Sequence, residues 1–241
     1  MLRARVGQLR DRGSVAFARE AASKMSRLLG EESSHHDELG RLFDAEYGTD
    51  TCGILQPWDS DIPDSLVGQA VHYATANVDV FVELLSRLDI THADYTFVDL
   101  GCGKGRALLL ASSFPFKQII GVELSPQLHH TSLLNIRRFR SDSQRCMNIV
   151  SLCENATLYT FPPENTVLYL FNPFGADTLR SVVAHLDWSL RTVPRRVYVI
   201  YVKPVHRRVF DQSGLFSILN SVQGNLTYVN NRFEGPQIAS C

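Results

Sequence analysis

The stretch FVDLGCGKGRALLL, residues 97–110, decides the fold. An apolar run ends in an acid, Asp99, three glycines then alternate with other residues, and a helical pattern follows. A strand, a glycine turn and a helix in this order form a nucleotide-binding geometry, because glycines let a ligand approach the backbone beside the helix N-terminus. A tight turn without a ligand has the same pattern, so the glycines alone leave both interpretations open.

Three further features narrow the choice of ligand. The third glycine, Gly105, comes two residues after Gly103, whereas a dinucleotide fingerprint places it three residues later. Asp99 stands two residues before Gly101, where a carboxylate suits an ammonium group and repels a pyrophosphate. The next predicted strand, QIIGVEL, brings Glu123 to its end, where a carboxylate can accept hydrogen bonds from two ribose hydroxyls.

The segments VDLGCGKGR and GVELS resemble the class I S-adenosylmethionine-dependent methyltransferases, whose first motif has the form (D/E)-x-G-x-G-x-G and whose second strand ends in an acid. The similarity covers residues 97–201, with 66–88 as a preceding helix. The resemblance implies S-adenosylmethionine as the cofactor. It assigns the methionine part to Asp99, Gly101, Cys102, Gly103 and Gly105, the ribose to Glu123 and the adenine face to Leu124.

Two further cofactor contacts follow from the same resemblance. Asn155, after the third strand, is expected to accept from the adenine amino group, and Glu154 takes this place if the alignment is shifted by one residue. Tyr73 lies where the family has an aromatic side chain near the methionine end. For Tyr73 the alternative is packing within a helix, and for Glu154 it is a solvent-facing loop position.

The fourth strand ends in VLYLFNPFG, residues 167–175. Asn172-Pro173-Phe174 resembles the (N/D/S)-P-P-(Y/F) motif of methyltransferases that modify amino nitrogens, although only one proline is present. The resemblance implies that Asn172 accepts from the target amino group and that Phe174 stacks on a planar substrate. The alternatives are that Asn172 caps the next helix and that Phe174 packs in the core. A hydroxyl acceptor would need a base, for which His72, His185 and His206 are candidates.

Apolar strand-like runs alternate with helical segments from residue 96 onward, which predicts an α/β fold with a doubly wound sheet covered on both faces. The resemblance implies seven strands, mostly parallel, with a final antiparallel hairpin. The predicted strands are 96–100, 118–124, 148–153, 166–171, 197–202, 215–222 and 226–231. The predicted helices are 36–47, 66–88, 107–113, 128–140, 178–191 and 205–211. Residues 1–64 form a predicted N-terminal helical extension and loop, and residues 65–241 form the cofactor-binding domain.

Composition excludes several classes of protein. The chain has 241 residues, 44% of them hydrophobic, and a net charge of −1, so it lacks the broad basic field of a non-specific nucleic-acid binder. Five irregularly spaced cysteines predict reduced thiols in a cytoplasmic protein, with no metal site. No run is long enough for a membrane span. The first thirty residues carry seven basic and two acidic residues. This charge suits an arm that contacts nucleic acid or an acidic partner, an organelle-targeting peptide, a solvated amphipathic helix or a frayed end.

The sequence therefore predicts methyl transfer from S-adenosylmethionine to an unidentified acceptor. Amino nitrogens of proteins, nucleobases and small molecules all stay open, and net charge does not favour nucleic acid. Nothing in the sequence indicates an oligomeric state. The alternatives are an NAD(P)-dependent oxidoreductase, which the glycine spacing and Asp99 disfavour, and an inactive cofactor-binding interaction module.

Overall fold

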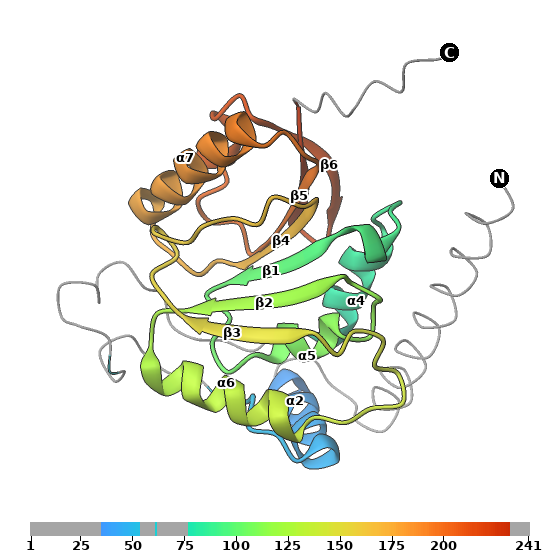
Figure 1. The fold of residues 1–241 in the computed structure, drawn as a ribbon. Coiled ribbons are helices and arrows are strands. Elements are labelled where there is room, and N and C mark those ends of the chain that lie inside the picture. The colour runs from blue at the N-terminus through green and yellow to red at the C-terminus, as the bar shows by residue number, and fades with distance from the viewer. Residues whose placement is uncertain (1–34, 54–60, 62–76, 232–241) are drawn as a thin grey trace, which may run out of the picture.

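A seven-stranded sheet in the order β3-β2-β1-β4-β5-β7-β6 forms the centre of the computed structural model (Figure 1). The structure describes residues 35–53, 61 and 77–231, so the basic N-terminal arm, His72 and Tyr73 lie outside the described residues. The strands are β1 (Thr96–Leu100), β2 (Gln118–Glu123), β3 (Ile149–Cys153), β4 (Thr166–Phe171), β5 (Val197–Val202), β6 (Phe216–Val222) and β7 (Asn225–Asn230).

The first five strands are parallel and the last two form a hairpin whose inner strand, β7, runs antiparallel to β5. Gln223 and Gly224 make the hairpin turn, with φ of 49° and 80°. Positive φ at both turn residues is the two-residue geometry that matches the twist of the flanking strands. The predicted fold class, including the antiparallel hairpin, is confirmed.

Helices cover both faces of the sheet (Figure 1). Helices α4 and α5 pack on one face, together with side chains at the end of α6, and α7 and α8 pack on the other. This arrangement explains why every residue of β1 and all but the last residue of β4 are buried: each strand is covered on both sides. The helices are α2 (His35–Tyr47), α4 (Val78–Ser86), α5 (Arg106–Ala111), α6 (Pro126–Arg138), α7 (Ala176–Thr192), α8 (Arg208–Asp211) and the 3₁₀ helix η2 (His92–Asp94).

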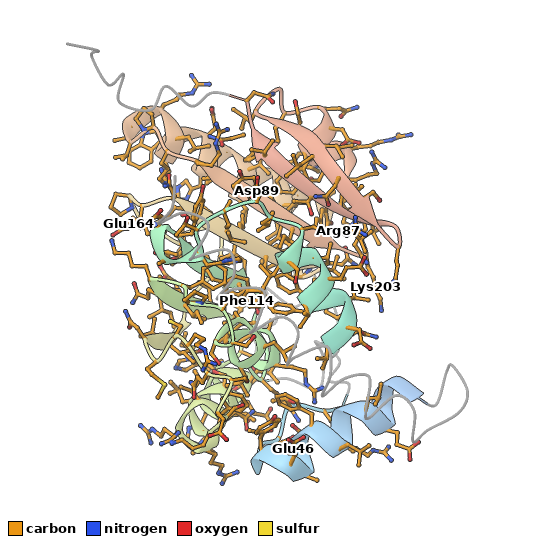
Figure 2. All side chains as sticks on the ribbon, turned by 90° about the vertical axis from the view of Figure 1, so that its right-hand side faces the viewer. Glu46, Arg87, Asp89, Phe114, Glu164 and Lys203 are labelled. Carbon is orange, nitrogen blue, oxygen red and sulfur yellow. The ribbon has the colours of Figure 1, made fainter. Side chains whose placement is uncertain are left out.

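The core consists of two clusters, one on each face of the sheet. Phe114, 1% exposed, lies in the middle of the molecule, whereas Glu46 and Lys203 lie at its edge (Figure 2). The first cluster extends beyond the sheet to α2, because Phe43 and Tyr47 contact the ring of Phe139 after α6. Figure 1 shows α2 beside α6 accordingly. Helix α2 is thus packed against the end of α6.

One predicted helix is wrong in its extent. Residues 66–88 read as a single helix with Ser65 as the N-cap, but the chain at Asn77 is extended and its side-chain oxygen accepts from the N–H of Val80. Asn77 is therefore the N-cap of a new helix, α4, which begins at Val78. Apolar periodicity hid this boundary, because an asparagine within a periodic pattern is compatible with a helix interior as well as with a cap.

None of the helices in the described part of the chain is long and apolar enough to cross a membrane.

Close contact between α5 and β2 generates a stability prediction. A Cβ atom at Gly121 would lie 2.6 Å from Cδ1 of Leu108 and 2.7 Å from Sγ of Cys102, both buried. Gly121→Ala should therefore overpack this interface and lower the free energy of unfolding by about 1–3 kcal/mol. Thermal and denaturant unfolding of the purified variant measures the loss. Gly175→Ser is the control, because nothing lies within 4 Å of a Cβ there; equal losses in both variants would contradict the explanation.

Candidate functional site

The glycine loop between β1 and α5 has a backbone that only glycine adopts readily. Gly101, Gly103 and Gly105 have φ of 80°, 54° and 87°. All three lie in the region where a Cβ would clash with the backbone. The alternation of glycines in the sequence is thus explained by a run of positive φ at every second position.

The glycine loop touches the Asn-Pro-Phe segment directly. A Cβ at Gly101 would lie 2.5 Å from Cβ of Pro173, so any side chain there would displace the proline. The structure therefore brings together two segments that the sequence singled out independently. They meet at the carboxyl ends of β1 and β4, the edge at which open α/β sheets bind ligands.

Glu123 ends β2 and faces the same loop. Its Oε2 accepts from the N–H of Gly103 at 2.7 Å, and its Oε1 accepts from the N–H of Ser125 at 2.9 Å. The residue is 7% exposed. Burial raises the pKa of Glu123, although the backbone N–H groups around it act in the opposite direction. Two backbone donors leave other lone pairs of this carboxylate free for a ligand.

Asp99 is the second carboxylate at this edge and is 3% exposed. Burial raises the pKa of Asp99 well above its usual value of 3.8, and the nearby Glu123 raises it further. Within the described residues neither carboxylate forms a salt bridge with a basic side chain. Two buried like charges without a protein cation are costly, and a cationic ligand would relieve that cost. The arrangement therefore fits a ligand that carries positive charge and hydroxyl groups.

Asn172, directly after β4, has φ of 43° and thus a left-handed backbone. Its Oδ1 accepts from the hydroxyl of Tyr201 at 3.3 Å, and that hydroxyl accepts from the N–H of His206 at 3.4 Å. The N-cap of α7 is Gly175, so Asn172 is not the helix cap that the sequence offered as an alternative. Its side chain is instead held by the hydroxyl of Tyr201 on β5, the strand next to β4.

The remaining predicted residues lie around this edge. Phe174 is half-buried and packs against the second core cluster, and Leu124 is half-buried after β2. Cys102 is buried, with Sγ 3.9 Å from Oγ of Ser151. Asn155 lies in the turn after β3, where its Oδ1 accepts from N and Oγ1 of Thr157 at 3.0 and 2.9 Å. A ligand at Asn155 would share an oxygen that already accepts two hydrogen bonds.

Sequence reasoning missed the side chains that frame the site from the N-terminal part of the chain. Asp61 accepts from Oγ of Ser125 at 2.6 Å and from N of Gln127 at 2.9 Å, at the start of α6. Asp44 forms a salt bridge with Arg106, directly after the glycine loop, and Asp50 forms one with Lys104, within the loop. These pairs are far apart in sequence, and only the alternation of acids in DAEYGTD, residues 44–50, hinted at them.

Comparison with known proteins agrees with this geometry. A family model described as a putative methyltransferase matches residues 93–174, about a third of the chain. Among curated proteins, no sequence matches at a significant level.

Solved structures with a similar fold are distant. A ribosomal protein L11 methylase from Lactobacillus delbrueckii has 14% identity and a TM-score of 0.42, over 57% of this chain and 69% of that chain. A predicted N6-adenine-specific DNA methylase from Listeria monocytogenes has 14% identity and a TM-score of 0.47, over 65% and 50%. Magnesium protoporphyrin IX methyltransferase from Synechocystis, with bound SAH, has 13% identity and a TM-score of 0.44, over 63% and 80%. At such distances these likenesses carry no argument about substrate.

The family match identifies residues 93–174 as part of a putative methyltransferase, and the sheet order is that of the Rossmann-like class I methyltransferase fold. These findings support methyl transfer from S-adenosylmethionine, with an acceptor that is not identified. In the described part of the chain, no group of three or more His, Cys, Asp or Glu side chains is arranged to hold a metal ion.

Burial of Asp99 generates a prediction about stability and pH. Its pKa is higher in the folded than in the unfolded chain, so the folded protein binds more protons and loses stability as the pH rises above 3.8 towards the folded pKa. Asp99→Asn should therefore raise the Tm of the ligand-free protein at neutral pH and weaken this pH dependence. Thermal unfolding from pH 4 to pH 8 measures both effects.

The exposed Asp142 provides the matched control for that measurement. Asp142→Asn removes the same formal charge from the surface and should leave Tm and its pH dependence almost unchanged. A lower Tm for Asp99→Asn than for the wild type at neutral pH would contradict the electrostatic account.

Proposed function

We propose that this protein binds S-adenosylmethionine between the glycine loop and Glu123 and transfers its methyl group to an amino nitrogen held at Asn172. The observation that supports the proposal is the pair of buried carboxylates, Asp99 and Glu123, at the ends of adjacent strands with no salt bridge from the described residues. The bound cofactor supplies an activated methyl group on a sulfonium, together with an ammonium group and a ribose.

Each carboxylate has a role that its surroundings suit. Asp99 lies closest to the turn at Gly101, where the positive-φ backbone allows the methionine part to approach, and it would pair with the ammonium group. Glu123 would accept from the ribose hydroxyls while the N–H groups of Gly103 and Ser125 hold it in place. Leu124 and Asn155 remain predicted adenine contacts, and Tyr73 a predicted contact at the methionine end.

The electrostatics of this edge argue against a nicotinamide dinucleotide. A pyrophosphate at the glycine loop would lie beside Asp99 and Glu123, and Asp61 is held near them at Ser125. Three carboxylates would repel its two negative charges, and the basic side chains of the loop, Lys104 and Arg106, are engaged by Asp50 and Asp44. A ligand with a net positive charge fits the same groups without conflict.

An amino nitrogen is the acceptor that Asn172 suits. Its amide cannot act as a strong base at neutral pH, but its Oδ1 can accept from an N–H while it also accepts from Tyr201. Transfer from a sulfonium needs alignment more than acid–base help, because the donor is already activated. A planar amino group is the class expected at Asn172 and Phe174, whether it belongs to a small molecule, a nucleobase or a protein.

The binding test uses the demethylated product S-adenosylhomocysteine, S-adenosylmethionine and NADH. We expect the two sulfur ligands to bind and to raise Tm by linkage, and NADH to do neither. Calorimetric titration at several temperatures and thermal unfolding measure binding. Absence of both heat and thermal shift with both sulfur ligands would overturn the proposal.

Glu123→Ala should weaken binding of S-adenosylhomocysteine by about tenfold to a hundredfold, since hydrogen bonds to a charged group contribute about 1.5–3 kcal/mol. The variant loses a buried carboxylate with a raised pKa, so it should stay folded at neutral pH. Calorimetry on the folded variant gives the affinity, and circular dichroism checks the fold. Wild-type affinity would mean that another residue holds the ribose.

Asn172→Ala should impair transfer more than cofactor binding, because the proposed cofactor contacts lie on other segments. Cofactor affinity should stay within a few-fold of the wild type, while turnover falls by on the order of a hundredfold. Tyr201→Phe removes only the hydroxyl that holds Asn172 and should give a smaller loss. Methyl-labelled cofactor, incubated with protein, RNA and small-molecule fractions of an extract, identifies the acceptor and measures turnover. Full activity of Asn172→Ala would move the search to Tyr73 and His206.

A further inference from the structure

Residues 44–52 contact the glycine loop, and Asn135 on α6 forms hydrogen bonds to both segments. Asn135 is fully buried, and its Nδ2 donates both to the carbonyl of Lys104 in the loop, at 2.9 Å, and to the carbonyl of Asp50, at 2.7 Å. Its Oδ1 accepts from the N–H of Asp50 at 2.8 Å. Every donor and one acceptor position of this amide is used to bind the N-terminal segment to the loop.

Lys104 adds a second connection. It occupies a variable position within the glycine motif, yet its side chain is only 19% exposed. Nζ lies 2.7 Å from Oδ1 of Asp50 and donates to the carbonyl of Cys52 at 2.8 Å. A lysine in a solvated loop would not bury its stem and ammonium in this way, so the side chain serves the contact between segments.

Arg106 adds the third connection and is buried as well. It is 3% exposed in the first turn of α5, where the helix dipole disfavours a cation. Its guanidinium lies 4.5 Å from the ring centre of Phe43, donates to Oγ1 of Thr51 at 2.7 Å and lies 3.6 Å from Oδ1 of Asp44. A buried cation persists only when it is paired, and all of these partners come from residues 43–51.

Asp44 organises the segment that supplies those partners. Its carboxylate accepts from the N–H groups of Thr51 and Cys52, both at 2.8 Å, and from the hydroxyls of Thr49 and Thr51. These hydrogen bonds lower the pKa of Asp44 despite its partial burial. Hydrogen bonds within residues 44–52 therefore hold the shape of this segment.

The same loop is also bound by Glu123, at the end of β2, which accepts from the N–H of Gly103. The loop thus lies between the proposed cofactor contacts and residues 44–52. We propose that Asn135, Lys104 and Arg106 are positioning residues, and that docking of residues 44–52 sets the loop conformation that binds the cofactor. This inference rests on the proposed function for the identity of the ligand. Because coupling is reciprocal, ligand binding must in turn stabilise the docked segment.

The experiment measures both directions of the coupling with S-adenosylhomocysteine. Lys104→Ala should weaken binding about fivefold to twentyfold in a calorimetric titration well below Tm, and Lys104→Arg should restore most of the affinity. Asp50→Ala should weaken binding as well, and the double variant Lys104→Ala/Asp50→Ala should be no weaker than Lys104→Ala, since the two side chains form one contact.

Lys117→Ala is the matched control. Lys117 also pairs with a carboxylate, Glu164, at 2.8 Å, but on the exposed surface, so its loss should leave affinity unchanged.

Hydrogen exchange supplies a measurement that a purely structural role would not change. In the wild type, saturating S-adenosylhomocysteine should slow exchange of the amides of Thr51 and Cys52, which bond to Asp44 and not to the proposed ligand contacts. In Lys104→Ala this ligand-induced protection should shrink. Wild-type affinity in Lys104→Ala, or a lower Tm with unchanged affinity, would overturn the inference and leave the proposed function intact. Failure of the wild type to bind would instead overturn the proposed function and the inference with it.

Discussion

Two carboxylates buried side by side at the ends of β1 and β2 are the constraint on which the site depends. Asp99 and Glu123 are 3% and 7% exposed, and their strands are hydrogen-bonded neighbours. Burial of like charges opposes folding unless donors or cations compensate. The protein compensates in part, with the N–H groups of Gly103 and Ser125, and leaves the rest of the negative potential facing the glycine loop. In the proposed function, this arrangement lowers the stability of the ligand-free protein and favours a cationic ligand.

The same constraint explains why the loop needs support from outside. Positive φ at three alternate glycines gives the backbone its close approach to a ligand, but glycine also loses the most conformational freedom on folding. Contacts from Asn135, Lys104 and Arg106 to residues 44–52 restrict that freedom without adding side chains on the ligand side. Lys104, between two glycines of the motif, and Arg106, directly after the third glycine, make the supporting contacts, while the glycines supply the positive-φ backbone.

Sequence reasoning succeeded where a local pattern has one physical cause. Buried parallel strands read as apolar runs, and the glycine spacing located the loop between β1 and α5, while ligand contacts at Asp99 and Glu123 stay a prediction. It failed where partners are distant in the chain. Arg106 and Thr51 are 55 residues apart, and Asn135 and Asp50 are 85 apart. No periodicity links such positions, so nothing in the sequence singles out Lys104 or Arg106 as a contact to residues 44–52.

Backbone strain at the other end of the site accords with the proposed role of Asn172 in methyl transfer. Asn172 and Lys203 follow adjacent strands, and both have left-handed backbones, with φ of 43° and 48°. Such conformations in non-glycine residues cost on the order of 1 kcal/mol or more and persist only where the surroundings hold them. Here Tyr201 holds the side chain of Asn172, and Asn225 accepts from the N–H of Lys203 at 3.0 Å.

Cofactor binding needs none of these arrangements, because none of the proposed cofactor contacts follows β4 or β5. A protein that had lost catalysis would be free to relax the backbone after β4. The close packing of Pro173 against Gly101 instead fixes the position of Asn172 relative to the glycine loop. A group that must be held at a set distance from the cofactor, at a cost in backbone strain, is what alignment of an acceptor nitrogen requires.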